Sequence, residues 1–175
     1  MKKLIAALTA ALMILALASC ADGGGEINLG NDSTTATQQT VEEGGGSFSF
    51  NAGRVSVTPH GDFANVEQYL GEPVSKEVSA SCAYIGYDKV FVYGGFTIQT
   101  YPDGDHDYVL WISVTDPSLK TEEGISIGST EAEVRAAYGD LFEARGSAYV
   151  YKKGKTSLSF MISGGVVKAI QYMAE

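Results

Sequence analysis

From Phe48 onward the chain alternates short apolar and polar runs separated by glycine, aspartate and proline. In the run from 157 to 162, Leu158, Phe160 and Ile162 occupy every second position, which is the spacing of one face of a β-strand. Gly164–Gly165 follows after one more residue and predicts a tight turn into a further strand. This pattern of alternating positions and turn residues indicates several short antiparallel strands.

Two segments have helical spacing instead. Val66 and Leu70 are four residues apart, as are Val134 and Tyr138, so each pair shares one helix face. The run Thr130–Glu133 fits a capping box, in which the threonine hydroxyl and the glutamate carboxylate bind free amides at the helix start. The residues expected to end these helices are Gly71 and Gly139.

The chain from 48 to 175 has an internal repeat, with halves of about 48–120 and 121–175. We therefore predict one α+β domain of two halves, each a helix followed by an antiparallel meander, with the sheet packed on the helices. Val74–Asp88 is expected to be an insertion, and the turn at Pro102–Asp105 to be longer than that at Gly164–Gly165. The matching segments are Val55–Val57 with Ile125–Ile127, Val66–Gly71 with Val134–Gly139, Phe91–Tyr93 with Tyr149–Tyr151, and Val109–Val114 with Val167–Tyr172.

The phrase from Thr121 to Tyr138, with Gly-Ile-Ser-Ile-Gly-Ser-Thr before a helix that ends in Tyr-Gly, suggests a fold family. It resembles the helix entry of the beta-lactamase inhibitor protein and of the small lipoprotein of the outer-membrane barrel-assembly machinery. The likeness extends over Phe48 to Tyr172. It implies a binding module, because members of this group bind other proteins, often through the sheet face.

The first twenty residues have the pattern of an export signal. Lys2 and Lys3 precede the uncharged apolar run Leu4–Ala18, which is shorter than the roughly 20 residues of a membrane-spanning helix. The run ends in Leu17-Ala18-Ser19-Cys20, which resembles the lipobox of bacterial lipoproteins. The resemblance implies cleavage before Cys20 and a lipid on its sulfur. The alternative is an ordinary secretory leader cleaved after Ala16-Leu17-Ala18.

Between this signal and the domain, the chain is rich in glycine, serine, threonine and glutamine. Such a composition cannot bury enough apolar surface to offset its backbone entropy, so we expect a flexible tether. The predicted organisation is therefore a signal peptide over 1–19, a lipidated cysteine with its tether over 20–47, and one domain over 48–175.

The overall charge restricts the possible partners. The chain has a formal net charge of −9. Binding to nucleic acid depends on clustered lysine and arginine, so we expect no nucleic-acid partner. The remaining expectation is attachment to the membrane through the lipid, on the extracytoplasmic side.

Few residues are suited to catalysis. Cys82 would be the only thiol left after lipidation, and His60 and His106 are the only histidines. A thiol enzyme that uses Cys82 with a histidine is one hypothesis, and a packing role for Cys82 is the alternative. The loop Asp103–Asp107 could hold a divalent ion, or it could be a solvated hairpin tip. We predict no resident cofactor, metal or catalytic site.

Aromatic residues are the remaining lead to function. Tyrosines crowd the first half, and alternation places Trp111 on the side opposite to Ile112. Tyr101 and Trp111 are the candidate binding residues, and ordinary core or cross-strand packing is the alternative for these aromatic side chains. The leading hypothesis is a non-enzymatic, lipid-anchored binding or adaptor module of the cell envelope, whose partner is another envelope protein. The alternative is an envelope hydrolase or thiol enzyme that uses Cys82.

The lipobox interpretation gives a direct prediction. Cys20→Ser should abolish incorporation of labelled fatty acid and leave the chain uncleaved at this position or released by another peptidase. Normal processing and unchanged membrane retention of this variant would contradict a lipid anchor at Cys20.

Overall fold

The structure is a computed structural model that describes residues 46–175. The signal peptide, Cys20 and nearly all of the tether predicted above lie outside the described residues. The α+β class is confirmed, since two short helices accompany an eight-stranded antiparallel sheet and a small two-stranded one. The elements are β1 Phe50–Asn51, β2 Ser56–Val57, α1 Ala64–Leu70, β3 Ser75–Ala80, β4 Tyr87–Val92, β5 Phe96–Asp103, β6 His106–Val114, α2 Glu131–Tyr138, β7 Glu143–Arg145, β8 Ala148–Lys153, β9 Thr156–Ser163 and β10 Val166–Ala174.

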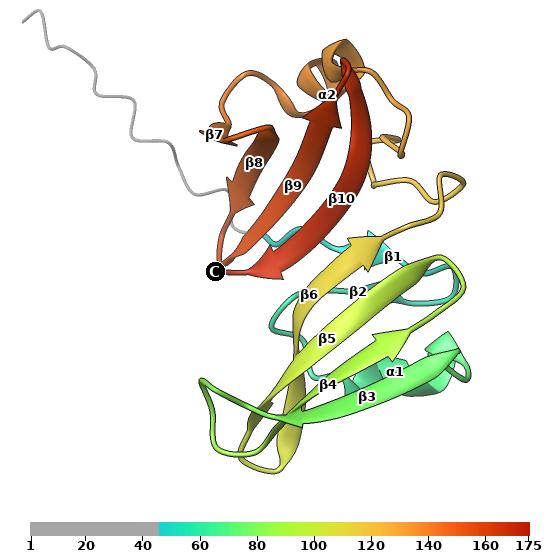
Figure 1. The fold of residues 1–175 in the computed structure, drawn as a ribbon, viewed down its shortest axis with the longest axis vertical. Helices are drawn as coiled ribbons and strands as arrows, with labels where there is room; N and C mark the ends of the chain where they lie inside the picture. Colours follow the sequence, from blue (N-terminus) through green and yellow to red (C-terminus); the bar gives the residue numbers. More distant parts are fainter. Residues whose placement is uncertain (1–45) are drawn as a thin grey trace, which may run out of the picture. The chain divides into compact units, whose positions relative to one another are not determined.

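The large sheet runs in the order β3-β4-β5-β6-β10-β9-β8-β7 (Figure 1). Each half contributes a four-stranded meander, and the last strands of the two meanders, β6 and β10, pair at the centre. Their register sets Ile112 opposite Tyr172 and Ser113 opposite Gln171. The two meanders therefore join into one continuous eight-stranded sheet.

One face of this sheet carries the core. The buried residues of six adjacent strands form a row across it, namely Phe91, Ile98, Ile112, Tyr172, Leu158 and Tyr151. The two helices cover this face, and Val134 of α2 is fully buried against it, with Val66 and Leu70 of α1 partly buried. Burial of this apolar surface is the main source of stability for such a layer.

The predicted helix signals are largely confirmed. Thr130 and Glu133 form the capping box of α2, with the Glu133 amide donating to the Thr130 hydroxyl at 3.2 Å. Gly71 and Gly139 end the helices with φ of +76° and +81°, a region that glycine enters without steric cost. At the start of α1, Asp62 accepts from the Ala64 amide at 3.0 Å.

Two expectations about the first meander are wrong. Val74–Asp88 is not an insertion, because it contains the edge strand β3 and the start of β4. β3 pairs with β4 but is exposed along its whole length, so its sequence lacks the apolar alternation that marks a half-buried strand. The turn after β5 is also not longer than its counterpart, since Asp103 pairs with His106 as Ser163 pairs with Val166.

The two halves also make matching contacts outside regular pairing. The residues ahead of each helix bridge to the last strand of the same half, Asp62 to Tyr108 and Thr130 to Val166. Each last strand has one extra residue relative to its neighbour, Leu110 in β6 and Lys168 in β10. Both extra residues come before the residues that pair β6 with β10. Each one reverses the face to which the following side chains point, so the two strands enter the central pairing with their side chains reversed in the same way.

Within residues 46–175, neither helix has the length and apolar character needed to cross a membrane.

The shared core predicts that the second half cannot fold alone. The fragment Thr121–Glu175 lacks β6, so it leaves Ile170 and Tyr172 without the strand that covers them, although both are about 1% exposed in the intact sheet. We expect this fragment to give no cooperative thermal transition by circular dichroism, whereas a chain beginning at Gly46 melts cooperatively. A cooperative melt of the fragment would mean that the halves are separate folding units.

Candidate binding face

The face of the sheet opposite the core is not covered by either described helix. We call it the open face. Alternation along β6 places Trp111 on it, between Gln99 of β5 and Met173 of β10. Each of these three side chains is half-buried among its neighbours. Two rows cross this face: Val90, Gln99, Trp111, Met173, Ser157 and Lys152, and beside it Ser75, Val92, Thr97, Ser113, Gln171, Ser159, Val150 and Glu143.

The second half of the open face is hollowed. A depression of about 180 Å³ is lined by Arg145, Ala148, Val150, Ser157, Ser159, Gln171, Met173 and Glu175. Its rim holds a charge network in which Arg145 contacts Glu143 at 2.9 Å and Lys152 contacts Glu175 at 3.1 Å. Positive and negative groups pair with each other here, so the depression offers no excess of either charge.

The first half of the open face holds a cluster that we call the tyrosine patch, formed by His60, Tyr84, Asp88, Tyr101 and Tyr108. Tyr84 stacks on Tyr101 with ring centroids 4.7 Å apart, and Tyr101 lies 5.8 Å from Tyr108. The Tyr101 hydroxyl shares a hydrogen bond of 3.0 Å with His60 Nδ1. Burial, with further contributions from Tyr84 and Asp103, raises the pKa of the Tyr101 phenol above its ordinary value.

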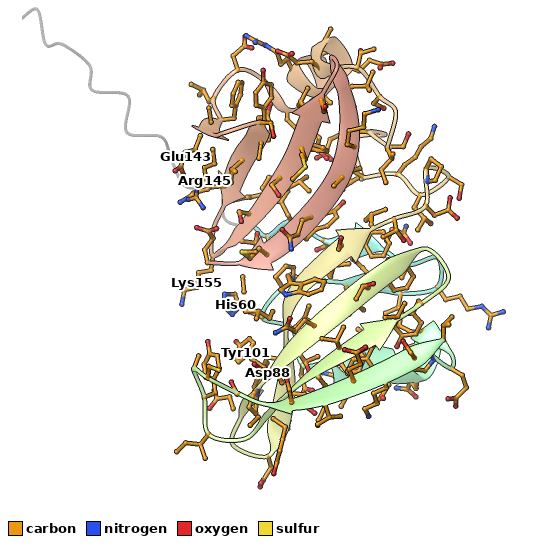
Figure 2. All side chains as sticks on the ribbon, viewed as in Figure 1. His60, Asp88, Tyr101, Glu143, Arg145 and Lys155 are labelled. Atoms are coloured by element: carbon orange, nitrogen blue, oxygen red, sulfur yellow. The ribbon has the colours of Figure 1, made fainter. Side chains whose placement is uncertain are left out.

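Asp88 joins this patch through the alternation of β4. Lys89 pairs with Thr100 across β4 and β5, so Asp88 and Tyr101 occupy neighbouring positions on the open face. Figure 2 shows Asp88, Tyr101 and His60 in succession on this part of the sheet. One oxygen of Asp88, Oδ1, is buried and has no hydrogen-bond partner in residues 46–175.

His60 has an unusual backbone. Its φ is +66°, and it is the only residue other than glycine with positive φ in the described chain. Its amide donates to the Val109 carbonyl at 2.8 Å, and in the second half Gly128, with φ of +95°, donates in the same way to Val167. Histidine therefore occupies a position at which the other half uses glycine, and such strain often marks functional sites.

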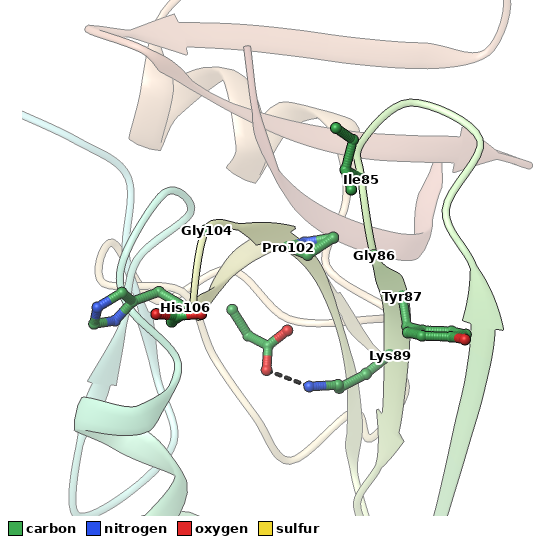
Figure 3. Close-up of a pocket in the computed structure, with 9 residues that line it drawn as sticks. Ile85, Gly86, Tyr87, Lys89, Pro102, Gly104 and His106 are labelled. Atoms are coloured by element: carbon green, nitrogen blue, oxygen red, sulfur yellow. Dashed lines mark hydrogen bonds and ion pairs between the residues drawn. The ribbon is translucent and has the colours of Figure 1, made fainter.

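The other side of the β5–β6 hairpin has a separate depression of about 200 Å³. The Lys89 ammonium and the Asp107 carboxylate form an ion pair of 2.5 Å at its centre (Figure 3). His106 lies at its edge and donates from Nδ1 to Asp62 at 2.7 Å. Each histidine is thus engaged with a different partner.

Cys82 is exposed, so the expectation that it packs in a buried alternating run is wrong. It lies in the hairpin between β3 and β4. Within residues 46–175 its sulfur makes no hydrogen bond to either histidine. No three histidine, cysteine or acidic side chains in that range lie close enough to hold a metal ion, including those of the loop Asp103–Asp107.

The sequence-based candidates Tyr101 and Trp111 both lie on the open face. Sequence reasoning did not find Tyr84, Asp88 or His60 as their neighbours. Asp88 was missed because its face depends on the register between β4 and β5. Tyr84 reaches the patch from an irregular hairpin, for which the sequence has no periodic signal.

No protein-family model matches the sequence, and no curated protein matches it. One solved structure resembles the chain, an extracellular protein containing a SCP domain from Bacillus anthracis str. Ames, with 16% identity and a TM-score of 0.41. The match covers 67% of this chain and 44% of that protein, so the chain spans less than half of its length. A TM-score of this size supports no inference about fold or function.

The backbone of His60 can be tested by paired substitutions. His60→Gly and His60→Ala both remove the imidazole, but only glycine adopts positive φ without steric cost. We expect His60→Gly to unfold with about 1 kcal/mol more free energy than His60→Ala in urea denaturation. Equal stability of the two variants would mean that this φ stores no strain.

Proposed function

We propose that the protein is a lipid-anchored binding or adaptor module on the extracytoplasmic side of a bacterial membrane, and that it is not an enzyme. The Leu17–Cys20 motif supports the anchor and the location. Its partner is another envelope protein, which it meets through the open face of the sheet.

The observation that carries this proposal is a broad sheet face that no described helix covers and that presents aromatic side chains. Trp111 lies near its centre, and the tyrosine patch and the 180 Å³ depression lie on its two halves. Tyrosine and tryptophan supply large contact areas at low cost in side-chain entropy and are enriched among the residues that dominate binding energy. A partner that contacts both halves would bury these side chains together.

A binding role also agrees with the contacts of the polar residues. A catalytic thiol needs a base or a positive group that lowers its pKa. Cys82 stands in an exposed hairpin, while His60 and His106 are hydrogen-bonded to Tyr101 and Asp62. These contacts favour positioning of side chains on a surface over activation of a nucleophile.

We also propose that the domain is a duplication of one helix-and-meander unit. Three matches support it: the order of strands about the central pair, the bridges Asp62–Tyr108 and Thr130–Val166, and the single extra residue in β6 and in β10. In this interpretation the second half keeps glycine at position 128, and the first half has acquired His60 and the tyrosine patch.

The proposal predicts a central role for Trp111. Envelope extract passed over the immobilised full chain should yield a partner whose affinity falls by about 2 kcal/mol or more, roughly thirtyfold, with Trp111→Ala. The control is Tyr69→Ala, which removes an aromatic ring that is 53% exposed on α1, away from the open face. Equal retention of the partner by a folded Trp111→Ala variant and by the control would rule out this face.

A further inference from the structure

The Asp88 carboxylate lacks a counterpart within the described chain. Its Oδ1 is buried without a hydrogen-bond partner, and no lysine or arginine in residues 46–175 forms an ion pair with it. A buried carboxylate oxygen without a donor is costly, and native structures usually supply a partner for such a group. The buried Oδ1 is itself closed to a ligand. The carboxylate still carries a charge that no described lysine or arginine pairs with, and its other oxygen, Oδ2, which is not buried in this way, is the acceptor that a ligand can reach.

The rings beside Asp88 favour a flat cation. Tyr84 stacks on Tyr101, and 44% of the Tyr84 surface is still exposed. Arginine is the side chain whose planar, charged group both stacks on aromatic faces and forms forked hydrogen bonds with a carboxylate. A stacked tyrosine pair next to an unsatisfied carboxylate matches both properties.

The charge around the patch has the complementary sign. Asp62 is already hydrogen-bonded to His106, but Asp103 adds negative charge beside the patch and contributes to the raised pKa of the Tyr101 phenol. The nearest lysine in the sequence, Lys89, projects from the other side of β4 and is paired with Asp107. The negative charge at the patch is therefore left for a partner to balance.

The second half has nothing comparable at the matching positions. Where the first half has His60 and Tyr108, the corresponding backbone contacts are made by Gly128 and Val166. The same fold therefore forms without the aromatic and polar groups of the patch. These groups are additions to the scaffold and not requirements of it.

We propose that the tyrosine patch binds an arginine side chain of the partner protein, with the guanidinium stacked on Tyr84 and hydrogen-bonded to Asp88. This inference rests on the proposed binding function and names the chemistry that the open face recognises. The arginine occupies the first half of the face, while Trp111 contributes contacts nearer the centre.

The test uses a dye-labelled hexaarginine peptide and the full chain in detergent micelles, with fluorescence anisotropy at about 150 mM salt. Asp88→Asn should weaken binding about tenfold or more, whereas Glu122→Gln, which removes the same charge from an exposed acid outside the patch, should change it less than about twofold. Tyr84→Ala should weaken binding about fivefold, and Tyr87→Ala, an exposed ring of the same hairpin outside the stack, should not.

Several results would overturn this proposal. Equal losses with Asp88→Asn and Glu122→Gln would mean general attraction to an acidic protein. Equal binding of hexalysine would remove the role of the planar guanidinium. Binding of an N-acetylglucosamine oligosaccharide in place of hexaarginine would make the patch a glycan site. If hexaarginine fails to bind while Trp111→Ala still reduces capture of the envelope partner, the arginine proposal fails and the binding function remains.

Discussion

The antiparallel pairing of β6 with β10 is the interaction on which the rest of the structure depends. Each meander alone would leave the edge of its last strand unpaired and one apolar face only partly covered. Pairing Ile112 with Tyr172 and Val114 with Ile170 satisfies that edge and aligns the core rows of the two halves. All four side chains are at most 3% exposed, so the hydrogen bonds and the apolar contacts of this pair stabilise the same junction.

The same pairing determines what the protein can present to a partner. Because the sheet is continuous, the two helices described in residues 46–175 cover one face and leave the other face open across eight strands (Figure 1). The two ends of that face differ in chemistry. The first half has stacked tyrosines and an unsatisfied acid, and the second half has a depression rimmed by paired charges. A partner that contacts both ends of the face would therefore bind more tightly than a partner that fits only one of them.

The sequence predicted those parts of the fold that depend on local chemistry. The capping box at Thr130, the glycine that ends each helix and the alternation at Leu158 and Phe160 are all short-range signals, and the structure confirms them. The edge strand β3 was missed because an exposed strand has no apolar alternation to detect.

The candidate site was less predictable for a related reason. Alternation was enough to place Trp111 opposite Ile112, but it did not show that Asp88 lies beside Tyr101. That proximity depends on hydrogen bonds between strands. The positive φ of His60 was not predicted, because a residue other than glycine gives no sign of it in the sequence.

The two outer edges of the sheet are unequal. β3 offers six exposed residues, with Lys76 and Glu77 as its charged positions, whereas β7 has only three residues and its Arg145 is held against Glu143. If the β3 strands of two copies paired with each other, both outer edges of the combined sheet would be β7 strands. An edge of three residues is too short to pair with another long strand. In that case growth by edge pairing would stop after that single addition, and the product would be a closed pair and not a fibre.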